Sequence, residues 1–267
     1  MISEDLPVTL LDVTVGTADF RRALASVLPH ASTDQDFPQL CRVRVWVDTR
    51  DELLYVGATD RYTAALAVVS VWQSSPPSSP PTMGCFDLGV DHVKKILAVF
   101  KTGRESLSED LPEWSLRVEL RLRVEAFEVR VTDVSGLPGM PGEMLESPTE
   151  LAESFPDLRG MFARWITAPQ GALTEVGVAG KLLTRFVTAA RTYGEPLILT
   201  ATEPLILTAT EGAGVCVRCG DSFLGFLAPR RAVEDDPTEQ TKQWLADWVA
   251  RLPAPTDTIT TIPEEQQ

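Results

Sequence analysis

One structural plan occurs three times along this chain of 267 residues, and the repeat constrains the fold more than any single motif does. The segments VTVGTADFRRAL, DLGVDHVKKIL and EVGVAGKLLTRF each join a short strand to an amphipathic helix through Gly or Gly-Val. Strand-like segments follow each helix. We call one such strand–helix–strands unit a half-module, and the three lie roughly 75 to 90 residues apart. The predicted fold class is therefore α+β, built from repeated half-modules.

The predicted elements follow from local periodicity. Apolar residues that alternate with polar ones predict strands, and apolar residues three or four apart predict helices. The helices are expected at 17–31, 91–103 and 179–194, the first with Thr17 as its N-cap. Strands are expected at 8–16, 39–48, 85–90, 115–125, 127–135 and 173–178, at EPLILTAT, GVCVRCG and FLGFLAPRR, and as a hairpin over 52–69. The Pro-rich run at 74–82 predicts a surface loop, because proline lacks the N–H that a strand ladder needs.

Three short motifs carry a family resemblance. ATDRYTAALAVV (58–69) resembles the ATDxxRLA turn of the bacterial DNA polymerase III sliding clamp, or β subunit, with Thr63 and Ala64 at the Arg and Leu places. FPDLRGMF (155–162) is similar to the FPDYRR or FPNL element that closes a clamp domain. FLAPRR (226–231) is similar to the VMPMRL strand that ends clamp chains, and Pro and Arg keep their places in it.

The resemblance implies the DNA-clamp fold, with sheets outside and the half-module helices together on one face. Clamp domains consist of two half-modules, so a clamp-like domain is expected at 1–162 and a further half-module at 163–231. The half-module that a clamp would place between Phe162 and Leu173 is absent. An acidic linker, an amphipathic helix and a polar tail are expected at 232–267. A closed clamp ring has twelve half-modules, so it would require a homo-oligomer of four such chains; a monomer or dimer that never encircles DNA is equally compatible with the sequence.

The function that the resemblance implies is that of a processivity factor, which tethers DNA polymerase or other proteins with clamp-binding peptides to double-stranded DNA. In the family, the ATDxxRLA turn borders the pocket for partner peptides. The residues at the matching places and on the last strand form the predicted partner-peptide pocket: Thr59, Asp60, Tyr62, Phe226, Leu227, Ala228 and Pro229. The alternative is a clamp-derived regulatory protein that binds replication partners or the host clamp without encircling DNA.

Charge is distributed unevenly between the helices and the rest of the chain. The net charge is −14, yet the helical segments 17–31, 91–104 and 179–193 carry nine Lys and Arg against Asp19 and Asp91. Their net charge of +7 leaves −21 for the remaining residues. A basic helix surface favours contact with the phosphate backbone of duplex DNA, although Lys and Arg are also common on ordinary surface helices. The predicted DNA-facing residues are Arg21, Arg22, Lys94, Lys95, Lys101, Arg104, Lys181, Arg185 and Arg191.

No catalytic or metal-binding pattern is evident in the sequence. His30 and His92 lie at the end of one helix and the start of another, where capping or surface positions are expected rather than catalytic bases. Cys216 and Cys219 form a lone CxxC inside a predicted strand, without the further ligands that a zinc site needs. Scattered cysteines and an acidic N-terminus predict a cytoplasmic protein, and no apolar run has the length of a membrane span. We therefore expect a binding protein, not an enzyme, that uses no cofactor or metal.

Two further segments have no counterpart in the half-module plan. EPLILTAT occurs twice in succession at 195–210, so either copy has the sequence for the strand after the third helix. The second copy is expected either to pair with the first across Glu203 and Pro204 or to form a long loop. A C-terminal helix at 238–252 is expected to pack on its own domain, to cover the predicted pocket or to bind a partner helix. Its apolar residues at helical spacing are Trp244, Leu245, Trp248, Val249 and Leu252.

Overall fold

The computed structural model describes residues 8–48, 50–74, 84–101, 114–123, 126–135, 142–149, 154–167, 178–202, 214–228, 243–244 and 246–247. The chain divides into two compact units, Met1–Pro229 and Arg230–Gln267. The helices of the first unit are α1 (Thr17–Val27), α2 (Val90–Val99), α3 (Leu158–Thr167) and α4 (Gly180–Tyr193), with short 3-10 helices at Leu28–His30 and Pro38–Leu40. Its strands are β1 (Val8–Gly16), β2 (Arg42–Asp48), β3 (Leu53–Thr59), β4 (Thr63–Ser74), β5 (Cys85–Gly89), β6 (Ser115–Arg123), β7 (Ala126–Asp133), β8 (Met144–Thr149), β9 (Leu197–Thr202), β10 (Gly214–Cys219) and β11 (Phe223–Leu227).

The first two half-modules interlock. Each begins with a strand, β1 or β5, which is followed by its helix and then by three further strands. Along the order β5-β2-β3-β4-β1-β6-β7-β8, strand β1 lies between β4 of its own half-module and β6 of the other, and β5 pairs with β2 of the other. The backbone N–H of Asp87 in β5 also donates to Thr149 Oγ1 at the end of β8, at 3.2 Å. Neither half-module therefore has a complete sheet of its own.

The third half-module adds its strands to the first. Strands β9, β10 and β11 form an antiparallel set, and β11 pairs with β4 from Phe223 opposite Ala67 to Leu227 opposite Thr63. Strand β4 has twelve residues, so its beginning pairs with β11 and its end, from Val71, pairs with β1. One long strand thereby joins the third half-module to the interlocked pair.

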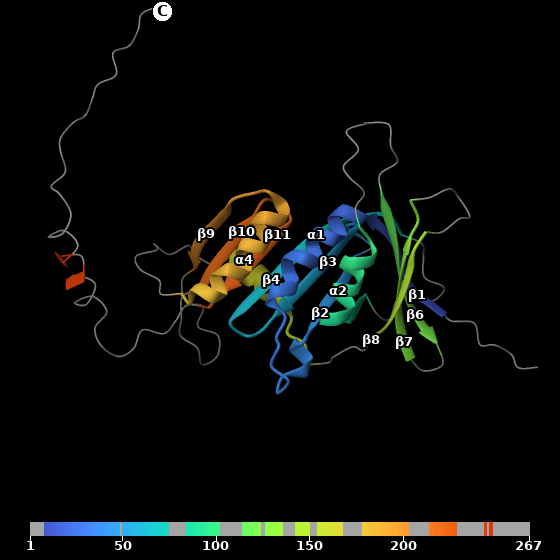
Figure 1. Ribbon diagram of the computed structural model, residues 1–267, viewed down its shortest axis with the longest axis horizontal. Coiled ribbons are helices and arrows are strands. Elements are labelled where there is room, and N and C mark those ends of the chain that lie inside the picture. The colour runs from blue at the N-terminus through green and yellow to red at the C-terminus, as the bar shows by residue number, and fades with distance from the viewer. Residues whose placement is uncertain are drawn as a thin grey trace, which may run out of the picture. The chain divides into compact units, whose positions relative to one another are not determined.

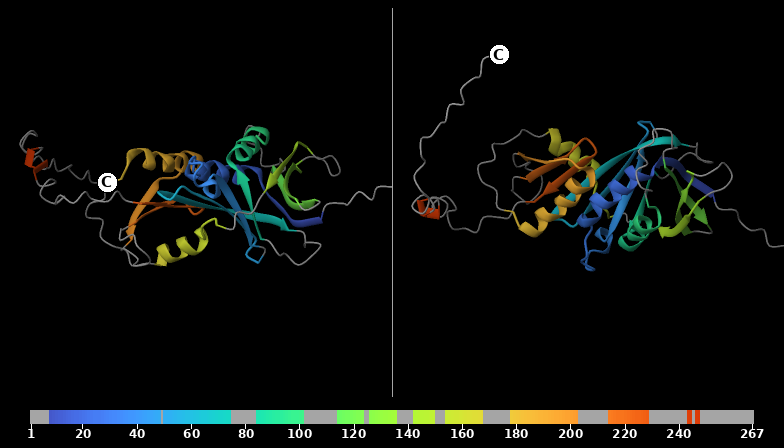
Figure 2. Two further views of the ribbon diagram at one scale, coloured as in Figure 1. Left: turned by 90° about the horizontal axis from the view of Figure 1, so that it is seen from below. Right: turned by 45° about the horizontal axis from the view of Figure 1, so that its top comes forward.

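The three half-module helices lie side by side on one face of the strands. Helix α1 packs against both α2 and α4, and Figures 1 and 2 show all three on the same side. Helix α3 lies on the opposite side, as the left view of Figure 2 shows. The predicted α+β class and the clustering of the helices on one face are both confirmed.

Alternation along the strands creates these two apolar faces. On β4, Ala65, Ala67 and Val69 belong to the main core under the helices, while Ala64 and Leu66 belong to a second cluster under α3. A strand covered on both faces needs apolar residues at every position, and the run AALAVV supplies them. The hairpin predicted over 52–69 is thus confirmed as the pair β3–β4 at the centre of the first unit.

Some elements differ from the predictions. Helix α1 ends at Val27, because Pro29 continues the chain as a 3-10 turn. Its N-cap is Gly16 rather than Thr17, whose hydroxyl is buried with no hydrogen-bond partner in the described part of the chain. Strand β8 and helix α3 have no counterpart among the predicted elements; the Pro148 of β8 is tolerated because this strand lies at the end of the ladder.

Several predictions fall wholly or partly outside the described residues: the strand at 173–178, the second EPLILTAT copy and the loop at 74–82. Of that loop, Ser74 alone is described, and it is the last residue of β4. In the second unit, four positions of the predicted C-terminal helix are described, and all are helical. There, Gln243 Nε2 donates to Asp247 Oδ1 at 3.0 Å, one helical turn away, and Trp244 is exposed. The predicted division at 162 and 231 stays a prediction.

Candidate partner-binding surface and basic helix face

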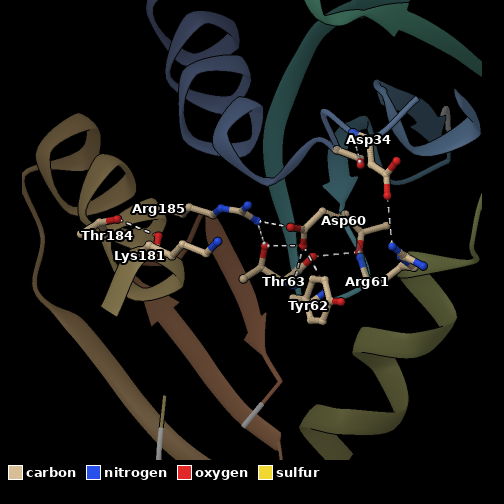
Figure 3. Close-up of polar contacts among 10 residues, drawn as sticks. Asp34, Asp60, Arg61, Tyr62, Thr63, Lys181, Thr184 and Arg185 are labelled. Carbon is tan, nitrogen blue, oxygen red and sulfur yellow. Dashed lines mark hydrogen bonds and ion pairs between the residues drawn. The ribbon is translucent and has the colours of Figure 1, made fainter. Parts of the chain in front are cut away.

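The turn between β3 and β4 is held by its own side chains (Figure 3). Asp60 Oδ1 accepts hydrogen bonds from the backbone N–H of Tyr62 at 3.1 Å and of Thr63 at 2.8 Å. Thr59 Oγ1 donates to the Thr63 carbonyl at 2.8 Å and accepts the Arg61 N–H at 3.2 Å. These bonds fix Arg61 at a φ of 80°, a conformation that side-chain-bearing residues rarely adopt. Thr59 and Asp60 are buried, and their hydrogen bonds shape the turn.

Arg185 of α4 is bound to this turn rather than exposed on the helix face. Its Nη1 lies 2.5 Å from Asp60 Oδ2 and 2.7 Å from Thr63 Oγ1 (Figure 3). Burial acts to raise the pKa of Asp60, but the hydrogen bonds from Arg185 and Thr63 outweigh it, and the pKa lies below its usual value. One predicted DNA-facing residue and one predicted pocket residue therefore form a structural ion pair between the third half-module and the first.

His30 lies beneath this ion pair, fully buried between the end of α1 and α4. Its ring is 4.6 Å from the ring of Phe186, and among the described residues neither ring nitrogen has a hydrogen-bond partner. Burial, and then the charge of Arg185, lower the pKa of His30 to about 3 against the opposing effect of Asp60. The prediction of a capping or surface position for His30 is wrong, because α4 covers it.

The end of β11 lies beside the turn, as the pocket prediction requires. The backbone N–H of Ala228 donates to the Tyr62 carbonyl at 2.8 Å, and Tyr62 is 57% exposed. Leu227 points instead into the main core under the helices, so it supports this surface from below. Phe226 faces the opposite side, toward α3. Pro229 lies outside the described residues.

Helix α3 covers the outer side of β4 and β11. Leu158 and Phe162 are buried against the sheet, and the ring of Trp165 stacks on Phe226 with centroids 3.8 Å apart and planes 16° apart. The sequence contains a signal for this helix, because Leu158, Phe162 and Trp165 have the spacing of one helical face. The contact with Phe226 has no such signal, since it joins residues 61 positions apart across two elements.

The remaining basic residues of the helix face divide into three groups. Arg21 donates to the carbonyls of Leu97 and Phe100 at the end of α2, and burial lowers its pKa. Arg22 and Lys94 are exposed but pair with the aspartates three residues earlier, at 2.6 and 3.1 Å. The third group is exposed at the surface: Lys95, Lys101, Lys181 and Arg191. Arg104 lies outside the described residues.

The described residues offer no group of three or more His, Cys, Asp and Glu side chains that could hold a metal ion. The cysteines at 41, 85, 216 and 219 are free thiols. Burial raises the pKa of Cys216 and of Cys219, which makes both poor nucleophiles and poor metal ligands. No helix in the described part of the chain is long and apolar enough to cross a membrane.

No family model matches the chain, and no curated protein matches it. Solved structures do match, among them the DNA polymerase III beta subunit of Thermotoga maritima, with a TM-score of 0.53 at 16% identity over 86% of this chain and 67% of that one. This chain has the sliding-clamp fold. The predicted resemblance to the bacterial sliding clamp is confirmed at the level of fold.

Two further clamp structures agree with this assignment. A putative DNA polymerase III beta subunit from Eubacterium rectale matches with a TM-score of 0.54 at 9% identity, over 90% of this chain and 73% of that one. The DnaN sliding clamp of Bartonella birtlesii, bound to griselimycin, matches with a TM-score of 0.54 at 11% identity, over 93% and 75%. The chain thus spans about two thirds to three quarters of the length of these clamps, while its pocket and DNA-facing residues stay predictions.

Proposed function

We propose that the protein is a sliding-clamp-like processivity factor that lies on duplex DNA with its helix face and tethers replication proteins to it. The observation that carries the proposal is the placement of α1, α2 and α4 side by side on one face, in a chain of net charge −14. Among the described residues, Lys95, Lys101, Lys181 and Arg191 are exposed, which suits sequence-independent contact with phosphates. In this proposal the protein binds and does not catalyse.

Salt-dependent DNA binding tests the helix face. Lys95→Ala combined with Lys181→Ala removes one exposed charge from α2 and one from α4. The slope of log K against log salt is negative, and each lost phosphate contact reduces its magnitude by about 0.9. The magnitude should therefore fall by up to about 1.8 in the double variant. The matched control is Arg164→Ala combined with Arg218→Ala, because both arginines are exposed and neither lies on the helix face. Arg164 is on α3, and Arg218 is on the side of β10 that faces away from the core. Equal slopes for both double variants and the wild type would rule out the helix face as the DNA surface.

The alternative is a regulatory protein that binds replication partners, or a host clamp, without encircling DNA. It is supported by two facts: the described residues include three helix-bearing half-modules, and the chain covers only part of the clamps that it matches. Light scattering separates the two: an assembly of four chains supports a ring, and a monomer supports the regulator. Retention on circular but not on linear duplex DNA would then demonstrate encirclement.

A further inference from the structure

The side of β4 and β11 that faces away from α1 and α4 carries an apolar patch, which we call the outer patch: Ala64, Leu66, Leu224 and Phe226. The strand register places Ala64 beside Phe226 and Leu66 beside Leu224, so the four side chains form one surface. The patch begins next to the turn at Thr63. An apolar surface of this kind is usually covered, by the chain itself or by a partner.

The cover is α3 together with Phe155, which precedes it. Trp165 lies flat on Phe226, and the ring of Phe162 meets the ring of Trp165 edge-on at 5.2 Å. Under this cover Ala64 is 2% and Leu66 is 8% exposed. The side chains that bury the outer patch therefore come from this chain itself.

The two ends of α3 are held unequally. At its beginning, Leu158 is fully buried, and Arg159 pairs with Asp48 at 3.3 Å while lying 4.4 Å over the ring of Tyr55. Near its end, Trp165 is half-buried and Ile166 is 56% exposed. The contact that joins the last turn of α3 to the sheet is thus the stack of Trp165 on Phe226, whereas the first turn is held by a buried side chain, an ion pair and a cation–π contact.

We propose that Trp165 occupies, in the free protein, the place where the apolar anchor of a partner peptide docks, so that the peptide and the last turn of α3 compete for Phe226. The inference rests on the proposed function, because it takes the outer patch as part of the partner-binding surface. The partner is a peptide with an aromatic or large aliphatic anchor, since the face of Phe226 that Trp165 covers in the free protein binds flat apolar groups. Only the fraction of molecules with a displaced last turn binds, and the apparent dissociation constant rises by the inverse of that fraction.

Removal of the Trp165 ring tests the competition. The variant is Trp165→Ala, and the matched control is Ile166→Ala, the next residue on the same helical turn but exposed. The probe is griselimycin, the ligand in the Bartonella birtlesii clamp structure, and its affinity is measured by titration calorimetry. We expect Trp165→Ala to bind about tenfold more tightly than the wild type, the factor that loss of one stacked aromatic pair can supply, and Ile166→Ala to match the wild type.

Further variants keep each outcome decisive. Trp165→Gln preserves a good helix former, so it replaces the alanine variant if circular dichroism shows that the latter is unfolded. Adding Phe226→Ala to either variant must abolish the gain. Affinity for Trp165→Ala equal to or weaker than that of the wild type, with an unchanged melting curve, would overturn the inference. So would a lack of binding by every variant, whereas the salt-dependent DNA binding described above decides the proposed function separately.

Discussion

The interlocked pair of half-modules and the third half-module reach a packed core in different ways. In the pair, the first strand of each half-module enters the sheet of the other, β1 beside β6 and β5 beside β2. Within the described residues, the third half-module exchanges no strand: β11 lies along β4, and α4 packs against α1. The pair is therefore joined by strand exchange, and the third half-module is attached at one edge.

Attachment at one edge concentrates stability in a few side chains. Phe186 lies between the rings of His30 and Phe223, at 4.6 and 6.4 Å, and Arg185 holds Asp60. The pair spreads its stability over two exchanged strands and a buried bidentate ion pair between Arg44 and Asp87 at 2.7 and 2.9 Å. We therefore expect the third half-module to open before the pair does.

The largest effect is expected from Phe186→Ala. The ring is fully buried at the junction, and a loss of about 4 kcal/mol in the free energy of unfolding is expected from the cavity. Hydrogen exchange measured by mass spectrometry should show lost protection in β9, β10 and β11 while β6 and β7 keep theirs.

The control for Phe186→Ala is Phe86→Ala, an equally buried phenylalanine in β5 of the interlocked pair. Its cavity should be similarly costly but should reduce protection throughout the first unit, because β5 begins one half-module of the pair and pairs with β2 of the other. The same exchange pattern in both variants would contradict the distinction between the two regions.

Arg185→Ala should have the next largest effect. It leaves the carboxylate of Asp60, whose side chain is 10% exposed, without its cationic partner, and a loss of about 3 kcal/mol is expected. Urea unfolding measures it, with Arg191→Ala as the control: the same change on the same helix at an exposed position, expected within about 0.5 kcal/mol of the wild type. Asp60→Ala also removes the hydrogen bonds of the turn, so the double variant should lose less than the sum of the two single variants. Strict additivity would show that the pair does not stabilise the junction.

The junction should also weaken in mild acid because of His30. Its pKa is about 3 in the folded protein and near 6.5 when unfolded, so between these values the unfolded state binds the extra proton and stability falls as pH falls. From pH 7 to pH 5 the loss should be about 2 kcal/mol. Asp60, whose pKa is lowered from 3.8 on folding, changes the stability only below that pH, outside this window. In His30→Leu the pH dependence between 7 and 5 should disappear; a persistent slope would assign it to other groups.

The same comparison separates what the sequence could predict from what it could not. Alternation and helical spacing depend on residues close in the chain, and they predicted the β3–β4 hairpin and the three half-module helices. The Arg185–Asp60 contact joins residues 125 positions apart, and no local pattern contains it. Burial of His30 likewise depends on α4 arriving from the third half-module. The prediction for His30 is wrong at this junction, because there the tertiary arrangement decides which polar groups are buried or paired.

The smallest effect on stability is expected from the two identical EPLILTAT copies, the first of which contains β9. Strand β9 is the first copy, with Thr202 opposite Gly214 and Leu197 opposite Cys219. If the second copy took the place of the first beside β10, each position would carry the same residue as before, because the copies are identical and eight residues apart. The same side chains would then face the core.

We therefore expect either copy to be able to pair with β10, and cross-linking to Cys216 measures which one does. Thr200 lies opposite Cys216, and Thr208 is its counterpart in the second copy. Thr200→Cys and Thr208→Cys, made separately and oxidised, should both form a disulfide with Cys216, since opposite residues lie within disulfide reach. Replacing Cys216 by Ala must remove both links. A choice between two equivalent strands stabilises the folded protein by only about 0.4 kcal/mol, so the effect on stability is small. A disulfide in Thr200→Cys alone would show that the third half-module uses one fixed strand.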